Sequence, residues 1–99
     1  MQRELRAAIV QDADSDRVLM LAWMDDEALR LTRERGEAHF FSRSRNGLWH
    51  KGETSGNVLR LVKILYNCEE STLLVKARLE GDAVCHTGNR TCFYRELDG

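Results

Sequence analysis

Three cysteines, Cys68, Cys85 and Cys92, are the residues of this chain whose type and spacing most clearly indicate chemistry. They are all the cysteines of the sequence, and they lie in its last third. Three thiolates form the protein ligand set of a catalytic zinc, in which water takes the remaining position. Free cysteines are also common in protein cores, so three small buried thiols are the alternative interpretation.

His86, directly after Cys85, admits two roles. As a fourth ligand it would close a structural zinc site of three cysteines and one histidine. Adjacent side chains point in different directions in an extended chain, which makes it awkward for Cys85 and His86 to ligate one metal. We therefore favour His86 as an acid–base group beside the metal, because imidazole titrates near neutral pH.

A second informative region, residues 38–57, is rich in hydrogen-bond donors and contains no acidic residue up to Gly52. Arg43 and Arg45 are two residues apart, so on a strand they would project from one face. Two guanidinium groups on one face suit a phosphate, which they bind bidentately. Three glycines in this region would let a ligand approach the backbone. The alternative is a solvated basic strand followed by a polar loop.

Length and composition limit the classes of protein that the chain can be. Its 99 residues predict one domain, residues 1–99, whose core is small enough for oligomerisation to add stability. The net charge of −1 argues against a nucleic-acid-binding protein, and the short apolar runs argue against a membrane span. The charged N-terminus and the odd number of cysteines lead us to expect a cytoplasmic protein.

Periodicity and turn residues predict an α+β domain with a mostly antiparallel sheet and one clear helix. Apolar runs at residues 7–10 and 17–23 predict a β-hairpin. A helix is expected between Asp25 as N-cap and Gly36 as C-terminal stop. Further strands are expected at residues 38–42, 58–66 and 72–79, the second of them central, with Cys68 at the end of one strand of a hairpin. Two aromatic residues in the tail, Phe93 and Tyr94, are expected to complete the core.

Taken together, the motifs of the chain resemble those of the phosphoribosyl-AMP cyclohydrolase family of histidine biosynthesis. The resemblance extends from about Ile9 to Phe93. It rests on VLMLAWM at 18–24, SRSR at 42–45, LW at 48–49 with KGETSGN at 51–57, and CHTG at 85–88 with Cys92 and Phe93.

This resemblance implies a hydrolase that adds water to C6 of the adenine ring of N1-(5-phosphoribosyl)-AMP and breaks the N1–C6 bond. It also implies an intertwined homodimer whose zinc is bound by cysteines of both chains, matching Cys68, Cys85 and Cys92. Because three thiolates and one Zn²⁺ carry a net negative charge, the zinc would acidify water less than a three-histidine site does. His86 is the candidate general base that would take the proton. The candidate substrate-binding residues are Arg43, Ser44, Arg45, Trp49, Lys51, Glu53, Thr54, Ser55, Asn57 and Arg90.

The chain departs from the family pattern around its first cysteine. The family usually carries Asp-Cys-Asp-x-Asp, whose aspartates are associated with magnesium, whereas the matching positions here are Asn67, Glu69 and Ser71. Mg²⁺ prefers hard anionic oxygen ligands in tight octahedral geometry. We therefore expect magnesium to bind weakly or not at all, unless Glu70 contributes through a shift of the loop.

Two other functions remain open on the sequence. The chain could be a paralogue that hydrolyses another purine nucleotide. It could also be a non-catalytic, zinc-stabilised module that binds phosphorylated ligands or a protein partner, with His86 as the fourth ligand of a closed site. A cyclohydrolase instead requires an open position at the metal.

Overall fold

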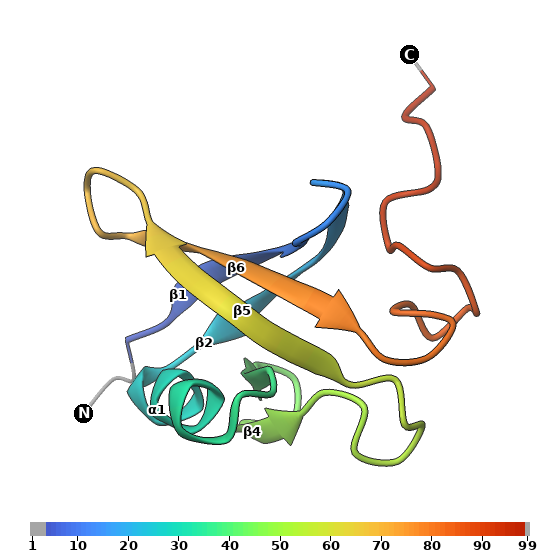
Figure 1. Cartoon of the computed structure of the whole chain (residues 1–99). Coiled ribbons are helices and arrows are strands. Elements are labelled where there is room, and N and C mark those ends of the chain that lie inside the picture. The colour runs from blue at the N-terminus through green and yellow to red at the C-terminus, as the bar shows by residue number, and fades with distance from the viewer. Residues whose placement is uncertain (1–3, 99) are drawn as a thin grey trace.

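Figure 1 shows the computed structural model, which describes residues 4–98. Four strands form one twisted sheet in the order β2-β1-β6-β5. Their bounds are Arg6–Asp12 for β1, Val18–Met24 for β2, Leu59–Tyr66 for β5 and Thr72–Leu79 for β6. The expected hairpins β1–β2 and β5–β6 are both confirmed as antiparallel pairs.

The centre of the sheet differs from the sequence expectation, because β1 and β6 pair in parallel. The sheet is therefore mixed rather than purely antiparallel. The strand at 59–66, expected to be central, lies instead at an edge of the sheet. Alternation of apolar residues identifies a strand and its buried face but does not specify which distant strand lies beside it or in which direction.

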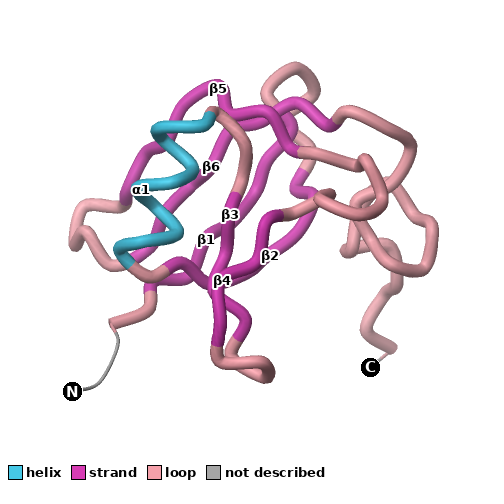
Figure 2. The backbone as a smooth tube through the Cα atoms, turned by 90° about the horizontal axis from the view of Figure 1, so that it is seen from below, coloured by secondary structure: helices cyan, strands magenta, loops and turns pink. Residues whose placement is uncertain are grey.

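The one helix of residues 4–98, α1 (Asp26–Arg35), begins and ends at the predicted residues. Asp25 caps it by accepting a hydrogen bond from the Ala28 backbone N–H at 2.8 Å. Gly36 follows in the left-handed conformation, with its N–H bonded to the Thr32 carbonyl. In Figure 2 the helix lies along one side of the strands, while the loops that precede the C-terminus gather on the other.

Two short strands, β3 (His39–Ser42) and β4 (Gly47–His50), form a separate antiparallel pair. The strand β4 was not anticipated, and the hairpin turn that precedes it contains Arg43 and Arg45. The prediction that these two arginines share one face of a strand is therefore wrong. The turn forms because Asn46 adopts a left-handed conformation with a φ of 50°, which asparagine tolerates better than most residues.

The core lies between the sheet, α1 and β3. It is formed by small and branched residues from the central strands and by larger side chains from the surrounding elements. Its fully buried members include Ala8, Val10, Leu19, Met24, Phe40, Leu59 and Val75. The aromatic residues of the tail do not join it, because Phe93 and Tyr94 remain 59% and 43% exposed. The expectation that they complete the core is wrong for the single chain.

Within residues 4–98, no helix is both long and apolar enough to cross a membrane.

Candidate functional site

A pocket of about 460 Å³ brings together residues from the two informative regions of the sequence. Trp49, Lys51, Ser55 and Asn57 come from the segment after β3, whereas Cys85, His86 and Cys92 come from the loop after β6. The remaining lining residues are Met20, Ala83, Val84 and Gly88.

The parallel pairing of β1 and β6 explains where the cysteine loop lies. Parallel strands end at the same edge of a sheet, so the chain leaving β6 emerges where β1 ends and β2 begins. The Cys92 backbone N–H donates to the Leu19 carbonyl of β2 at 2.7 Å. Residues 85–92, called the Cys85–Cys92 loop below, are therefore attached to a core strand more than sixty positions earlier in the chain.

Thr91 supplies most of this attachment, and the sequence analysis missed it. Its hydroxyl lies 2.8 Å from the Val18 carbonyl and 3.1 Å from the Leu19 carbonyl, and it accepts a hydrogen bond from the Phe93 N–H. The residue is almost fully buried. A buried threonine next to a cysteine gives no sequence signal of its own, because the carbonyls that it meets come from a distant strand.

The first half of the Cys85–Cys92 loop is closed by its own backbone. The Asn89 carbonyl accepts from the Val84 and Cys85 N–H groups, and the Gly88 N–H donates to the Cys85 carbonyl. Gly88 has a φ of 92°, which side chains other than hydrogen rarely allow. The turn directs Cys85 and His86 to the pocket.

The two thiols of the pocket have different environments. The Thr87 hydroxyl donates to Cys85 Sγ at 3.1 Å, and this bond lowers the pKa of the Cys85 thiol because it stabilises the thiolate. Cys92 is exposed as a residue, but its thiol faces the pocket, where desolvation and the nearby Cys85 raise its pKa. Cys85 is therefore the thiol that ionises first.

His86 lies at the rim of the pocket. Its Nδ1 is 4.0 Å from Cys85 Sγ, and the residue is exposed to solvent. An imidazole in this position can reach both bulk water and a molecule bound in the pocket.

Lys51, predicted to bind substrate, is buried instead of projecting into solvent. Only 9% of its surface is exposed, and its Nζ donates to the Val84 carbonyl at 2.6 Å. Burial lowers the pKa of its ammonium, whereas the negative charges of Cys92 and Cys85 oppose this shift.

Asn57 joins the KGETSGN segment to the turn after β6. Its Oδ1 accepts from the Asp82 N–H at 3.3 Å. A Cβ at Gly81 would overlap with this side chain, and a Cβ at Gly52 would lie 2.5 Å from the Asn57 carbonyl carbon. Both glycines also have positive φ angles. Gly81 therefore allows the turn after β6 to pack against Asn57, and Gly52 allows residues 52–58 to close on themselves. Ser55 lines the pocket beside Asn57, whereas Glu53 and Thr54 are exposed and lie outside its lining.

A neighbouring concavity of about 570 Å³ holds part of the predicted phosphate-binding region. The Arg43 guanidinium lies 4.5 Å from the centre of the Trp23 ring, and Ser44 lines the same concavity. Trp49 lines both hollows, so they meet at its ring. Arg45 and Arg90 are exposed and line neither of them.

The third cysteine, Cys68, lies in the turn between β5 and β6, at the opposite end of β6 from the loop that follows this strand (Figure 1). The eight residues of β6 span roughly 25 Å at the usual rise of a strand. Cys68 is exposed, and residues 4–98 contain no cluster of three or more Cys, His, Asp or Glu side chains able to hold a metal ion. One chain therefore brings two of the three predicted zinc ligands together and not the third.

Asn67 closes this turn. Its Oδ1 accepts from the backbone N–H groups of Ser71 at 2.8 Å and Thr72 at 3.1 Å, and its Nδ2 donates to Ser71 Oγ at 3.0 Å. These contacts, together with Glu70 at a φ of 57°, form the turn that presents Cys68.

A comparison with known proteins decides the family. The profile described as PRA-CH: Phosphoribosyl-AMP cyclohydrolase matches residues 20–94. The chain belongs to the phosphoribosyl-AMP cyclohydrolase family.

Curated phosphoribosyl-AMP cyclohydrolases align with nearly the whole length of this chain. The phosphoribosyl-AMP cyclohydrolase of Archaeoglobus fulgidus is 51% identical over 98 residues, covering 99% of this chain and 90% of that protein. The phosphoribosyl-AMP cyclohydrolase of Caulobacter sp. (strain K31) is 53% identical over 92 residues, which are 92% of this chain and 69% of that protein.

A longer relative is the histidine biosynthesis bifunctional protein HisIE of Caldanaerobacter subterraneus subsp. tengcongensis. It is 55% identical over 97 residues, which are 98% of this chain and 47% of that protein. The chain therefore spans about half the length of this relative.

The resemblance to the cyclohydrolase family implies a zinc site and a magnesium site. The donor atoms of this chain fit the zinc and do not fit the magnesium. Cys85 and Cys92 are two thiols that face one pocket, which suits zinc. At the predicted magnesium positions, Asn67 Oδ1 already accepts two backbone hydrogen bonds, and Glu69 is the one carboxylate of the three. Mg²⁺ would have to displace these bonds to bind there, so we assign no role to it.

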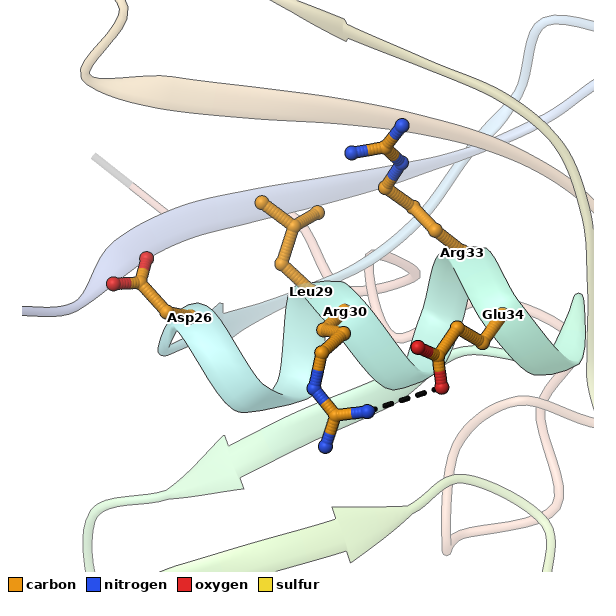
Figure 3. Close-up of a pocket in the computed structure, with 5 residues that line it drawn as sticks. All are labelled: Asp26, Leu29, Arg30, Arg33 and Glu34. Atoms are coloured by element: carbon orange, nitrogen blue, oxygen red, sulfur yellow. Dashed lines mark hydrogen bonds and ion pairs between the residues drawn. The ribbon is translucent and has the colours of Figure 1, made fainter.

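A third concavity, along α1, is separate from these residues (Figure 3). It is lined by Asp26, Leu29, Arg30, Arg33 and Glu34, and Arg30 and Glu34 form an exposed ion pair at 3.0 Å. An ion pair four residues apart is common on the solvated face of a helix. This concavity has no thiol or imidazole, and we assign no chemistry to it.

Proposed function

We propose that the chain is a zinc-dependent phosphoribosyl-AMP cyclohydrolase that acts as a homodimer. Membership of the family supports the activity and its place in histidine biosynthesis. The observation that carries the zinc and dimer parts of the proposal is the pocket that holds Cys85, Cys92 and His86 but lacks Cys68. A second chain that inserts its Cys68 turn there would complete the ligand set.

Exposed apolar residues agree with such a dimer. Val62, Leu65 and Tyr66 of the edge strand β5 are exposed, and so are Phe93 and Tyr94 of the tail. Burying apolar surface of this kind is the usual driving force of obligate dimers. Because the Cys68 turn directly follows β5, a contact through this edge would also place Cys68 of one chain near the partner.

In this mechanism, zinc held by the three thiolates would supply Lewis acidity for the activation of water. The residues of the chain bind and orient the nucleotide and move the proton. His86 is our candidate base, since its ring lies at the pocket rim and its neutral form can accept the proton of the attacking water. The proton can then pass to N1 as the N1–C6 bond breaks.

Substrate binding is divided between the two hollows that meet at Trp49. The Trp49 ring offers a face for stacking of the purine. Arg43, held over Trp23, is the candidate donor for one phosphate of the substrate, while Ser55 offers a neutral donor beside the cysteines. Ser44 lies next to Arg43 and has the same role. Arg45, Glu53, Thr54 and Arg90 line neither hollow, so they are weaker candidates.

The test is the ultraviolet change on ring opening of N1-(5-phosphoribosyl)-AMP, measured with zinc-loaded protein and with protein stripped by a chelator. We expect turnover with zinc, loss on stripping and recovery when zinc is restored. His86→Ala should retain zinc and lose most turnover. Folded, zinc-replete protein without turnover would contradict the proposal and favour a paralogue that acts on another purine nucleotide.

A further inference from the structure

We propose that Lys51 is a positioning residue for the metal-binding cysteines, holding the backbone before Cys85 and placing a positive charge beneath Cys85 and Cys92. This inference rests on the proposed zinc function and adds a residue to it. The sequence predicts a different role for Lys51, that of a donor to substrate.

The first argument is the burial of Lys51. A lysine side chain has four methylene groups and normally extends its ammonium to water, yet this one is 9% exposed. Placing an ammonium inside a protein is unfavourable unless negative charge or hydrogen-bond acceptors surround it. Within the described residues 4–98, Nζ donates to one acceptor, the Val84 carbonyl, which leaves two of its three N–H donors for other partners.

The second argument is the neighbourhood of the ammonium. Lys51 lines the same pocket as Cys85 and Cys92, and its Nζ is 5.8 Å from the centre of the Trp49 ring. No carboxylate of the described residues lines this pocket. The sulfurs of Cys85 and Cys92, which become thiolates when they bind a metal, are therefore the groups of this pocket that can compensate the buried ammonium.

The third argument is the charge of the complete site. Three thiolates and one Zn²⁺ carry a net charge of minus one, which weakens the acidification of water and leaves a negative charge in the pocket that needs a partner. A buried ammonium nearby makes the assembly neutral. Groups around a metal that orient and balance its ligands typically change metal affinity about 10–100-fold when they are removed.

The fourth argument is the backbone contact. The Val84 carbonyl belongs to the residue before Cys85, and Lys51 reaches it from thirty-three positions away in the chain. The Val84 N–H is already bonded to the Asn89 carbonyl, so both polar backbone groups of Val84 are satisfied. Lys51 thus locates the start of the Cys85–Cys92 loop, as Thr91 locates its end.

The experiment measures zinc affinity by competition with a chromophoric chelator and the thermal midpoint of the metal-free protein. The variants are Lys51→Met, which removes the charge, and Lys51→Arg, which keeps it. Lys76→Met is the control, because Lys76 lies on β6 outside the pocket and pairs with Asp16 at the surface. All proteins are the full chain.

We expect Lys51→Met to bind zinc about 10–100-fold more weakly, Lys51→Arg to recover most of this loss, and the control to stay near wild type. The midpoint of metal-free Lys51→Met should stay close to that of wild type, because loss of the hydrogen bond to the Val84 carbonyl opposes the gain from replacing a buried charge by an apolar side chain. A purely structural role would instead lower this midpoint and leave zinc affinity unchanged.

Two results would overturn the inference. One is wild-type zinc affinity in Lys51→Met with a raised KM, which would make Lys51 a substrate donor. The other is a lower midpoint with unchanged zinc affinity. If Lys51→Met does not fold, Lys51→Gln keeps a neutral donor for the Val84 carbonyl and allows the same comparison. Wild-type protein that binds no zinc would contradict the proposed function itself, whereas the results above leave it intact.

Discussion

The two regions that hold the cysteines are built in opposite ways. The Cys85–Cys92 loop is held by distant parts of the chain. Its Thr91 donates to carbonyls of β2, and Lys51, which follows β4, donates to the Val84 carbonyl just before the loop. The Cys68 turn is closed within itself, by Asn67 and Ser71. The first region is a pocket that needs one more ligand, and the second is an exposed ligand without a pocket. This difference is the basis of the proposed dimer, in which each copy of the chain would supply what the other lacks.

The largest effect should come from mixing variants that damage one region each. Cys68→Ser and Cys92→Ser should each be inactive, because every site of either homodimer lacks one thiolate. Mixed dimers hold one intact site, so unfolding and refolding the two variants together should restore about a quarter of wild-type turnover.

Turnover measured after refolding is the readout, with each variant refolded alone as the control. A mixture that stays at the level of the single variants would contradict a zinc site shared between chains.

A second prediction weakens the anchored region. Thr91→Val removes the hydroxyl that bridges two carbonyls of β2 and the Phe93 N–H, so it should lower the free energy of unfolding by about 1–3 kcal/mol. The same change at Thr72, beside the Cys68 turn, removes a hydroxyl that makes no hydrogen bond within residues 4–98. Urea denaturation of both variants measures how much unfolding free energy each one loses relative to wild type. An equal loss at the two positions would mean that Thr91 does not anchor the loop.

A third prediction concerns the self-closed region. Asn67→Ala removes the exposed side-chain hydrogen bonds that Asn67 makes with Ser71 and Thr72, and it should destabilise the fold by about 1 kcal/mol. Ser71→Ala should cost less, because the bond from the Ser71 backbone N–H remains. Two of these hydrogen bonds occupy Asn67 Oδ1, an atom that would otherwise be free to bind Mg²⁺. Adding Mg²⁺ to zinc-loaded wild type should therefore change neither turnover nor the melting temperature. Activation by Mg²⁺ would show that the turn opens to admit it.

The smallest expected effect comes from His39, at the start of β3, and it sets the pH range in which the variants can be compared. Burial lowers the pKa of His39 below its ordinary 6.5, because desolvation makes charging the ring unfavourable. Within residues 4–98, its Nε2 has no hydrogen-bond partner. The unfolded chain therefore binds this proton more readily than the folded one. The stability contributed by neutral His39 is complete above pH 6.5 and is lost as the pH falls below it, through the lower pKa of the folded state.

Urea denaturation between pH 7.5 and 5.5 should show this fall for wild type and a flatter profile for His39→Gln. Parallel profiles for the two proteins would assign the pH dependence to another group.

Local features of the sequence were enough to predict several elements and the family. Asp25 and Gly36 mark the helix ends because capping depends on residues within one turn. The β1–β2 hairpin and the alternation along β6 follow from neighbours in the chain. The spacing of KGETSGN and CHTG identified the family, and Cys85, Cys92 and His86 do meet in one pocket with Lys51 and Asn57.

Tertiary structure alone decided the rest, because those features depend on which distant segments lie side by side. Nothing near β1 or β6 specifies their parallel pairing, yet that pairing brings Cys92 to Leu19 and leaves Cys68 at the far end. A lysine in a polar, glycine-rich segment gives no sign that it will be buried. Lys51 is buried because residues 51–57 pack closely against residues 81–84, where Gly81 meets Asn57 and the Val84 carbonyl meets Lys51.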